Sequence, residues 1–274
     1  MYIANMPIQK VNALQINECL LELTSKYANS SISKVRMRLA KIYNKSYLNG
    51  IIKEVPFTIK NYLIQPKSKK KDKIIEAFTV EEQQKFMQQL KLKNYKYKDV
   101  FYTLIETGMR VGEVLALRRT DVDFKNNIIH VKRSLTKDKN DRVKIGTNTK
   151  TYNGIRDVPL SKQLKEILLA NMNIDLFFTL PDGKLITPST INSHFKRICK
   201  DAGIRPCIYE LHRKGKIIKL KSSNVNTHLL RKCYASRSIE SGMSAVVLQR
   251  ILRPLKYKNY ARYIYISIQP FQNK

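Results

Sequence analysis

Apolar residues recur at helical spacing along much of the chain, and this pattern predicts a largely helical protein. Near the N-terminus it predicts two helices, residues 10–27 and 33–49, with a turn at 28–32 between them. The side chains expected to face the interior are Leu14, Ile16, Leu20, Leu21 and Leu23 in the first helix and Val35, Leu39, Ile42 and Tyr43 in the second. Further helices are expected at residues 79–90, 161–172 and 190–202. Thr79 followed by Glu82 is a capping-box signature that predicts where the first of these begins.

Three short runs in the middle of the chain, residues 128–135, 143–146 and 155–160, are predicted to be strands. The dipeptide Asn153-Gly154 is a type I′ hairpin signal, so the last two strands are expected to pair across it. The expected fold is therefore α+β and mainly helical, with a three-stranded antiparallel sheet.

A junction between two predicted helices precedes these strands. Residues 100–105 have helical spacing, and Gly108 is the residue type that ends a helix in a left-handed conformation. A second amphipathic run starts at Val111 and carries Glu113 in its first turn. Arg110 lies between the two helices, so we expect it to be rigidly held and buttressed by Glu113. For an isolated arginine and glutamate at this spacing, an ordinary surface salt bridge is the simpler interpretation.

The formal net charge is +31, from 52 Lys and Arg against 21 Asp and Glu. The basic residues are spread along the chain, so the expected partner is a polyanion, most simply nucleic acid. A ribosomal or membrane-surface protein would also be basic, but no uninterrupted apolar span or signal peptide is present in the sequence, which favours a soluble intracellular protein. The four cysteines lack the spacing of a metal site, so reduced thiols and no metal are expected.

Residues 66–73 have no periodicity and contain five lysines, which predicts a flexible basic linker. The linker would separate a small helical domain, residues 1–65, from a larger domain, residues 74–274. Basic residues of the small domain and the linker are expected to contact DNA phosphates. They are Lys34, Arg36, Arg38, Lys41 and Lys45 in the second helix and Lys69, Lys70 and Lys71 in the linker.

Two further features are weak signals by themselves. In the run VNTHLLRKCYASR, His228 and Arg231 are three residues apart and so share a helix face. Lys150 lies just before the Asn153-Gly154 turn, between two predicted strands. Its position distinguishes it from the many other lysines.

Taken in order, these residues resemble the active-site residues of the tyrosine recombinases, the phage-integrase family, and the likeness extends over nearly the whole chain. The stretch with Arg110 and Glu113 resembles box I of the family, Lys150 resembles its hairpin lysine, and His228 and Arg231 match its HxxR motif. The resemblance implies site-specific DNA recombination or integration. The two arginines would hold the scissile phosphate, and the lysine and histidine would manage the protons.

The resemblance also implies the rest of the reaction. A tyrosine would attack the phosphate and form a 3′-phosphotyrosyl bond, which conserves the energy of the broken linkage, so no cofactor is needed. The partners would be double-stranded DNA and further copies of the chain, as a tetramer on paired sites. A cytoplasmic protein of a bacterial host, encoded by a prophage or mobile element, is the expected setting.

The chain departs from the family pattern at both ends. The family's small domain has a further helix before the segment with which this sequence starts, so that first helix is expected to be missing. After residues 245–252 the family continues with Gly-His and later the nucleophilic tyrosine, whereas this chain has Arg253-Pro254. By counting from that point Tyr263 is the preferred nucleophile, and Tyr265 is the alternative.

One hypothesis for the second departure is a change of reading frame. Codons can be chosen for residues 253–267 so that reading one base later spells Gly-His and, further on, Thr-Thr-Leu-Asp-Thr-Tyr, as in the family. On this hypothesis the segment is an out-of-frame product, at least one further lesion is required, and the ancestral tyrosine corresponds to Ile264. Two hypotheses follow: a working recombinase that uses Tyr263 or Tyr265, or a catalytically impaired DNA-binding remnant.

Overall fold

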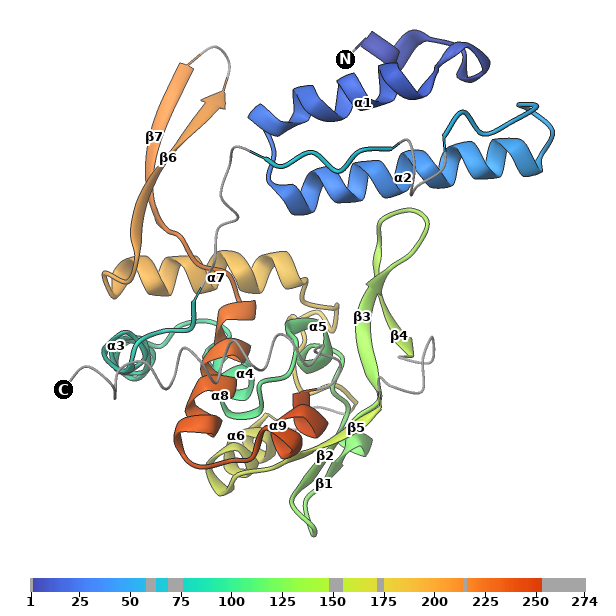
Figure 1. Ribbon diagram of the computed structural model, residues 1–274. Coiled ribbons are helices and arrows are strands. Elements are labelled where there is room, and N and C mark those ends of the chain that lie inside the picture. The colour runs from blue at the N-terminus through green and yellow to red at the C-terminus, as the bar shows by residue number, and fades with distance from the viewer. Residues whose placement is uncertain are drawn as a thin grey trace. The chain divides into compact units, whose positions relative to one another are not determined.

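In the computed structural model the chain forms two compact units, Met1–Ile74 and Ile75–Lys274 (Figure 1). The structure describes residues 2–57, 63–68, 76–147, 155–171, 175–213 and 216–252. The α-helices are α1 (Ala13–Glu22), α2 (Asn29–Leu48), α3 (Val80–Leu92), α4 (Lys98–Thr107), α5 (Val111–Val114), α6 (Lys162–Ala170), α7 (Pro188–Asp201), α8 (His228–Glu240) and α9 (Ala245–Leu252). The strands are β1 (Val122–Asp123), β2 (Ile128–Val131), β3 (Arg133–Lys137), β4 (Val143–Thr147), β5 (Arg156–Pro159), β6 (Pro206–Arg213) and β7 (Lys216–Ser223).

The first unit is built around helices α1 and α2. Helix α1 begins with a reciprocal capping box, in which Asn12 and Gln15 each accept the other's backbone N–H at 3.0 Å. Tyr43 on α2 packs edge-on against Phe57, with ring centroids 5.2 Å apart. The buried core residues of this unit are Val11, Ile16, Leu20, Ile32, Ala40, Tyr43, Ile52, Phe57 and Leu63.

Several details of this unit differ from the sequence prediction. Helix α2 begins at Asn29, so the turn before it is shorter than the predicted 28–32. Leu14 and Leu21 on α1 are 67% and 52% exposed, because they lie on the helix face opposite the buried Ile16. Ile42 on α2 is also 52% exposed. Leucine and isoleucine alone therefore did not identify the buried face.

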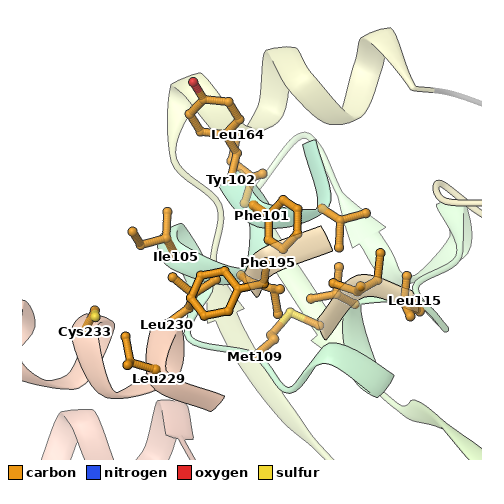
Figure 2. Close-up of a cluster of buried hydrophobic side chains, with 14 of the residues drawn as sticks. Phe101, Tyr102, Ile105, Met109, Leu115, Leu164, Phe195, Leu229, Leu230 and Cys233 are labelled. Carbon is orange, nitrogen blue, oxygen red and sulfur yellow. The ribbon is translucent and has the colours of Figure 1, made fainter. Parts of the chain in front are cut away.

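The second unit has a helical core in which aromatic rings join three helices. Phe195 on α7 lies 5.4 Å from Phe86 on α3 and 5.9 Å from Phe101 on α4, measured between ring centroids. Figure 2 shows Leu229 and Leu230 of α8 directed toward this cluster. Helix α8, which carries the HxxR motif, is therefore packed against the same core as α4.

Helix α3 confirms the capping box expected from the sequence. Thr79 Oγ1 accepts the backbone N–H of Glu82 at 3.1 Å, and Glu82 Oε2 accepts that of Thr79 at 3.0 Å. The helix then runs to Leu92, two residues beyond the predicted end.

The strands form a three-stranded antiparallel sheet of order β1-β2-β5, but its membership differs from the prediction. The predicted strand 128–135 is divided at Lys132 into β2 and β3. β4 pairs with β3 in a separate two-stranded sheet, and β5 pairs with β2, Val131 lying opposite Arg156. The expected pairing of the last two strands is therefore wrong. A hairpin dipeptide indicates a reversal of the chain, but it does not specify which earlier strand the returning strand joins.

A long β-hairpin, β6 and β7, was not predicted. Its eight paired positions run from Pro206 opposite Ser223 to Arg213 opposite Lys216. Exposed Ile208 and Lys219 lie on it, so it lacks the regular inward-outward alternation of a strand that covers a core. The hydrophobic pattern therefore gave no strand signal for this segment.

The helix junction forms as expected, although α5 is only four residues long. Gly108 has a φ of +59° and its N–H donates to the Leu104 carbonyl at 3.0 Å, which ends α4. A Cβ at this position would lie 2.6 Å from Tyr234 Cδ1 and 2.8 Å from Leu252 Cδ2. The left-handed turn lets the backbone approach helices α8 and α9 closely.

Gly108→Ala is therefore expected to lower the free energy of unfolding by about 2–5 kcal/mol, combining left-handed strain with overpacking. Gly203→Ala is the matched control, because Gly203 has a φ of +67° with no atom within 4 Å of its added Cβ. It should cost only about 1–2 kcal/mol. Urea denaturation measures both, and equal losses would contradict the close packing at Gly108.

Candidate active site

Glu113 is a buried carboxylate held between two arginines. Its Oε1 accepts from Arg110 Nη1 at 2.8 Å and from Arg156 Nη1 at 3.1 Å. Its Oε2 accepts from the Arg110 backbone N–H at 2.8 Å and from Arg156 Nη2 at 2.6 Å. The Glu113 side chain is 2% exposed, and the Arg110 side chain is 39% exposed. Arg110 is therefore fixed from the protein side while its outer surface is open to a ligand.

This environment keeps Glu113 ionised. Burial alone would raise the pKa of its carboxyl group, but the hydrogen bonds and charge of Arg156, together with those of Arg110, outweigh burial and lower the pKa. The pairing of Arg110 with Glu113 is thus no ordinary surface salt bridge, because one partner is buried and both of its oxygens are hydrogen-bonded to both arginines.

Arg231 lies on α8 and is held by backbone carbonyl groups. Its Nη1 donates to the Gly108 carbonyl at 2.6 Å, and its Nη2 donates to the Leu252 carbonyl. The residue is buried. These bonds place its guanidinium beside the segment Gly108–Glu113, at the side where α9 ends.

His228 is the first residue of α8, one helical turn before Arg231. Its backbone N–H donates to Asn226 Oδ1 at 3.1 Å, and the residue is exposed to solvent. Desolvation lowers its pKa below the ordinary 6.5, and the charges of Arg231, Lys232 and Arg110 lower it further. The neutral imidazole is therefore favoured near neutral pH, a form that can accept a proton.

The cluster has an excess of positive charge. Arg110 and Arg156 bond to a single carboxylate, Glu113, and a third guanidinium group, on Arg231, bonds to the nearby Gly108 carbonyl. Guanidinium groups suit phosphate because they present several N–H donors in one plane. The arrangement can bind an anion and stabilise additional negative charge that develops on it.

The sequence prediction missed Arg156. The signal was present, because along β5 the buried positions alternate and Val158 faces the core, which places Arg156 inward as well. A charged residue at an inward position of a strand requires a buried partner. That partner is Glu113, 43 residues earlier in the chain.

Other predicted site residues lie outside the described part of the chain. They are Lys150, Tyr263, Tyr265, Lys69, Lys70 and Lys71, together with the whole of residues 253–267 on which the reading-frame hypothesis depends. Their roles stay predictions.

The predicted basic residues of the first unit divide into two groups on α2. Lys34, Arg38, Lys41 and Lys45 are exposed, and their spacing of four, three and four residues places them on one helix face. Arg36 lies elsewhere on the helix, where it is partly buried and its Nε donates to the Leu63 carbonyl at 3.1 Å. Arg36 therefore also has a structural contact within its own unit.

The fold and this cluster define a class of protein. A model of the phage integrase family matches residues 76–263, more than half of the chain. The chain belongs to this family, the tyrosine recombinases.

Among known sequences, the chain is 25% identical to the XerC-like tyrosine recombinase of Caldanaerobacter subterraneus subsp. tengcongensis, covering 90% of this chain and 65% of that protein. It is 29% identical to the ICEBs1 integrase of Bacillus subtilis strain 168, over 61% of this chain and 44% of that one. The chain thus spans roughly half to two thirds of the length of these curated relatives.

Solved structures share the fold. The Tn1549 transposon integrase, in complex with a circular intermediate DNA, superposes with a TM-score of 0.71 at 18% identity, covering 97% of this chain and 86% of that chain. The XerH site-specific recombinase, bound to a palindromic difH substrate in a post-cleavage complex, gives a TM-score of 0.65 at 16% identity, covering 97% and 72%. At these identities the likeness establishes the tyrosine recombinase fold.

The described residues form neither a metal-binding cluster nor a membrane-spanning helix. No group of three or more His, Cys, Asp or Glu side chains there could hold a metal ion. No described helix is both long enough and apolar enough to span a bilayer.

His228 should titrate below the ordinary histidine pKa of 6.5, which an NMR titration of its imidazole measures. Because the folded-state pKa is depressed, the unfolded chain takes up this proton first. Stability should therefore be independent of His228 above pH 6.5 and fall as the pH is lowered through that value. Lys232→Gln should raise the pKa of His228. A pKa at or above 6.5 in the unmodified protein would contradict the described site.

Proposed function

We propose that the chain cuts and rejoins double-stranded DNA in site-specific recombination or integration, through a 3′-phosphotyrosyl intermediate. The observation that carries the proposal is the gathering of Arg110, His228 and Arg231 around the segment Gly108–Glu113. These are residues that the sequence matched to the family's box I and HxxR motif.

The chemistry follows from the charge of a phosphodiester. Attack on the phosphorus atom places additional negative charge on the nonbridging oxygens, and preorganised guanidinium groups stabilise that charge without a metal. Arg110 and Arg231 would bind these oxygens. A tyrosine hydroxyl, with a pKa near 10, also needs such cationic surroundings to attack near neutral pH.

The remaining roles complete the proposed reaction. His228, favoured in its neutral form, would accept or return a proton, and Lys150 would protonate the departing 5′ oxygen. Tyr263 is the proposed nucleophile and Tyr265 the alternative. Lys34, Arg38, Lys41 and Lys45 would contact DNA phosphates from α2. Exchange of strands between two sites would require a tetramer.

Arg110→Ala or Arg231→Ala should reduce covalent adduct formation by about 10²-fold or more while leaving DNA retention nearly unchanged. Each arginine is one contact among many for binding but a principal stabiliser of the transition state. The substrate is a duplex selected for retention by the protein and nicked beside the crossover phosphate, so that the cleaved strand cannot religate. Adducts are measured on denaturing gels and retention on native gels.

Arg197→Ala is the matched control, because Arg197 belongs to the same unit but contacts His194 and the Tyr95 ring. It should form adducts at the unmodified rate. Retention without any adduct in the unmodified protein would contradict the proposed chemistry and favour a DNA-binding remnant. Equal losses of retention and adduct in the Arg110 and Arg231 variants would show that these residues are structural.

A further inference from the structure

We infer that Arg156 is a positioning residue of the recombination site, which sets the orientation of Arg110 relative to the end of α9 by way of Glu113. This inference rests on the proposed function, because a positioning role has meaning only if Arg110 binds a phosphate. Neither the family motifs quoted for this chain nor the sequence prediction included Arg156.

Three contacts of the Arg156 guanidinium carry the inference. Nη1 and Nη2 donate to the two oxygens of Glu113 at 3.1 and 2.6 Å. Nε donates to the Ile251 carbonyl at 2.6 Å. The side chain is 3% exposed, so water does not compete for these bonds. One planar group thus joins strand β5 to the helix junction and to the end of α9.

Glu113 transmits this constraint to Arg110. Each carboxylate oxygen accepts one bond from Arg156 and one from Arg110. The carboxylate therefore cannot rotate without breaking bonds to both residues. Without the Arg156 fork, the buried charge of Glu113 would depend on Arg110 alone and would draw its guanidinium inward.

The last turn of α9 is also held by arginine side chains. Arg156 donates to the Ile251 carbonyl and Arg231 to the Leu252 carbonyl, the last two carbonyl groups of α9. Cations also interact favourably with the negative end of a helix dipole. Two arginines therefore bond to the last turn of α9, and each is also bonded to the segment Gly108–Glu113.

The contact with α9 bears on the reaction because of chain order. Residue 252 is the last described residue, and both candidate nucleophiles follow it in the sequence. The Arg156 guanidinium thus links the phosphate-binding arginine with the point from which the nucleophile segment starts. A small displacement of one relative to the other would misalign attack, and misplacement by about 1 Å can cost about 10²-fold in rate.

Arg156→Lys tests the inference, because lysine keeps the charge but not the planar fork. Two quantities are measured on the full chain: the pKa of His228 by NMR, and the rate of covalent adduct formation on the nicked duplex per folded molecule. We expect the pKa of His228 to shift, because Arg110, one of the charges that lower it, changes position. The adduct rate should fall about 10²-fold, with DNA retention unchanged.

Arg205→Lys is the matched control. Arg205 also forms a fork on a carboxylate, to Glu82 at 2.8 and 2.7 Å, and donates to the carbonyls of Glu76 and Ala77. None of these groups belongs to the candidate site, so this variant should leave both quantities unchanged. Replacing Arg156 or Arg205 with lysine removes hydrogen bonds in both cases. Only at a positioning residue should the replacement also change the pKa of His228 and the adduct rate.

Glu113→Asp is a second variant that retains the buried charge but withdraws the carboxylate by one methylene. It should shift both quantities in the same direction, and it keeps the inference testable if Arg156→Lys does not fold. An unchanged His228 pKa together with an unchanged adduct rate in either folded variant would overturn the inference. Absence of adduct from the unmodified protein would instead overturn the proposed function, while the His228 pKa would still report on the position of Arg110.

Discussion

The structure of the candidate site depends on one buried interaction, the ion pair between Glu113 and Arg156. Removing two charges from water is costly, and the cost is offset only when geometry and hydrogen bonding are complete. Here both carboxylate oxygens are satisfied by Arg156 and Arg110 together. The pair therefore fixes the helix junction, strand β5 and the end of α9 in one arrangement.

This ion pair gives the three arginines of the site different roles. Arg156 is buried and used entirely within the protein contacts described, whereas Arg110 shares the same carboxylate but keeps an exposed outer surface. Arg231 enters from α8 and bonds to the Gly108 carbonyl. The excess of guanidinium over carboxylate makes the cluster suited to an anion. Desolvation lowers the pKa of His228, and the charges of Arg231 and Arg110 lower it further.

Local signals in the sequence predicted much of this architecture. The Thr79 capping box, the left-handed Gly108 and the shared helix face of His228 and Arg231 depend on neighbours within a few residues, and each formed as expected. Features set by distant contacts were missed: the pairing of β5 with β2, the β6–β7 hairpin and the inward-facing Arg156. A lone charged residue in a short strand becomes informative only when its partner across the fold is known.

The most direct test of the central claim is a double-mutant cycle between Glu113 and Arg156, measured as the free energy of unfolding in urea. Glu113→Gln and Arg156→Gln should each cost about 3–5 kcal/mol, because the first leaves the buried Arg156 without its carboxylate and the second leaves the buried Glu113 with Arg110 alone. The double variant should cost less than the sum by about 2 kcal/mol or more. Costs that add to within about 0.5 kcal/mol would show that the two side chains are energetically independent, contrary to this account.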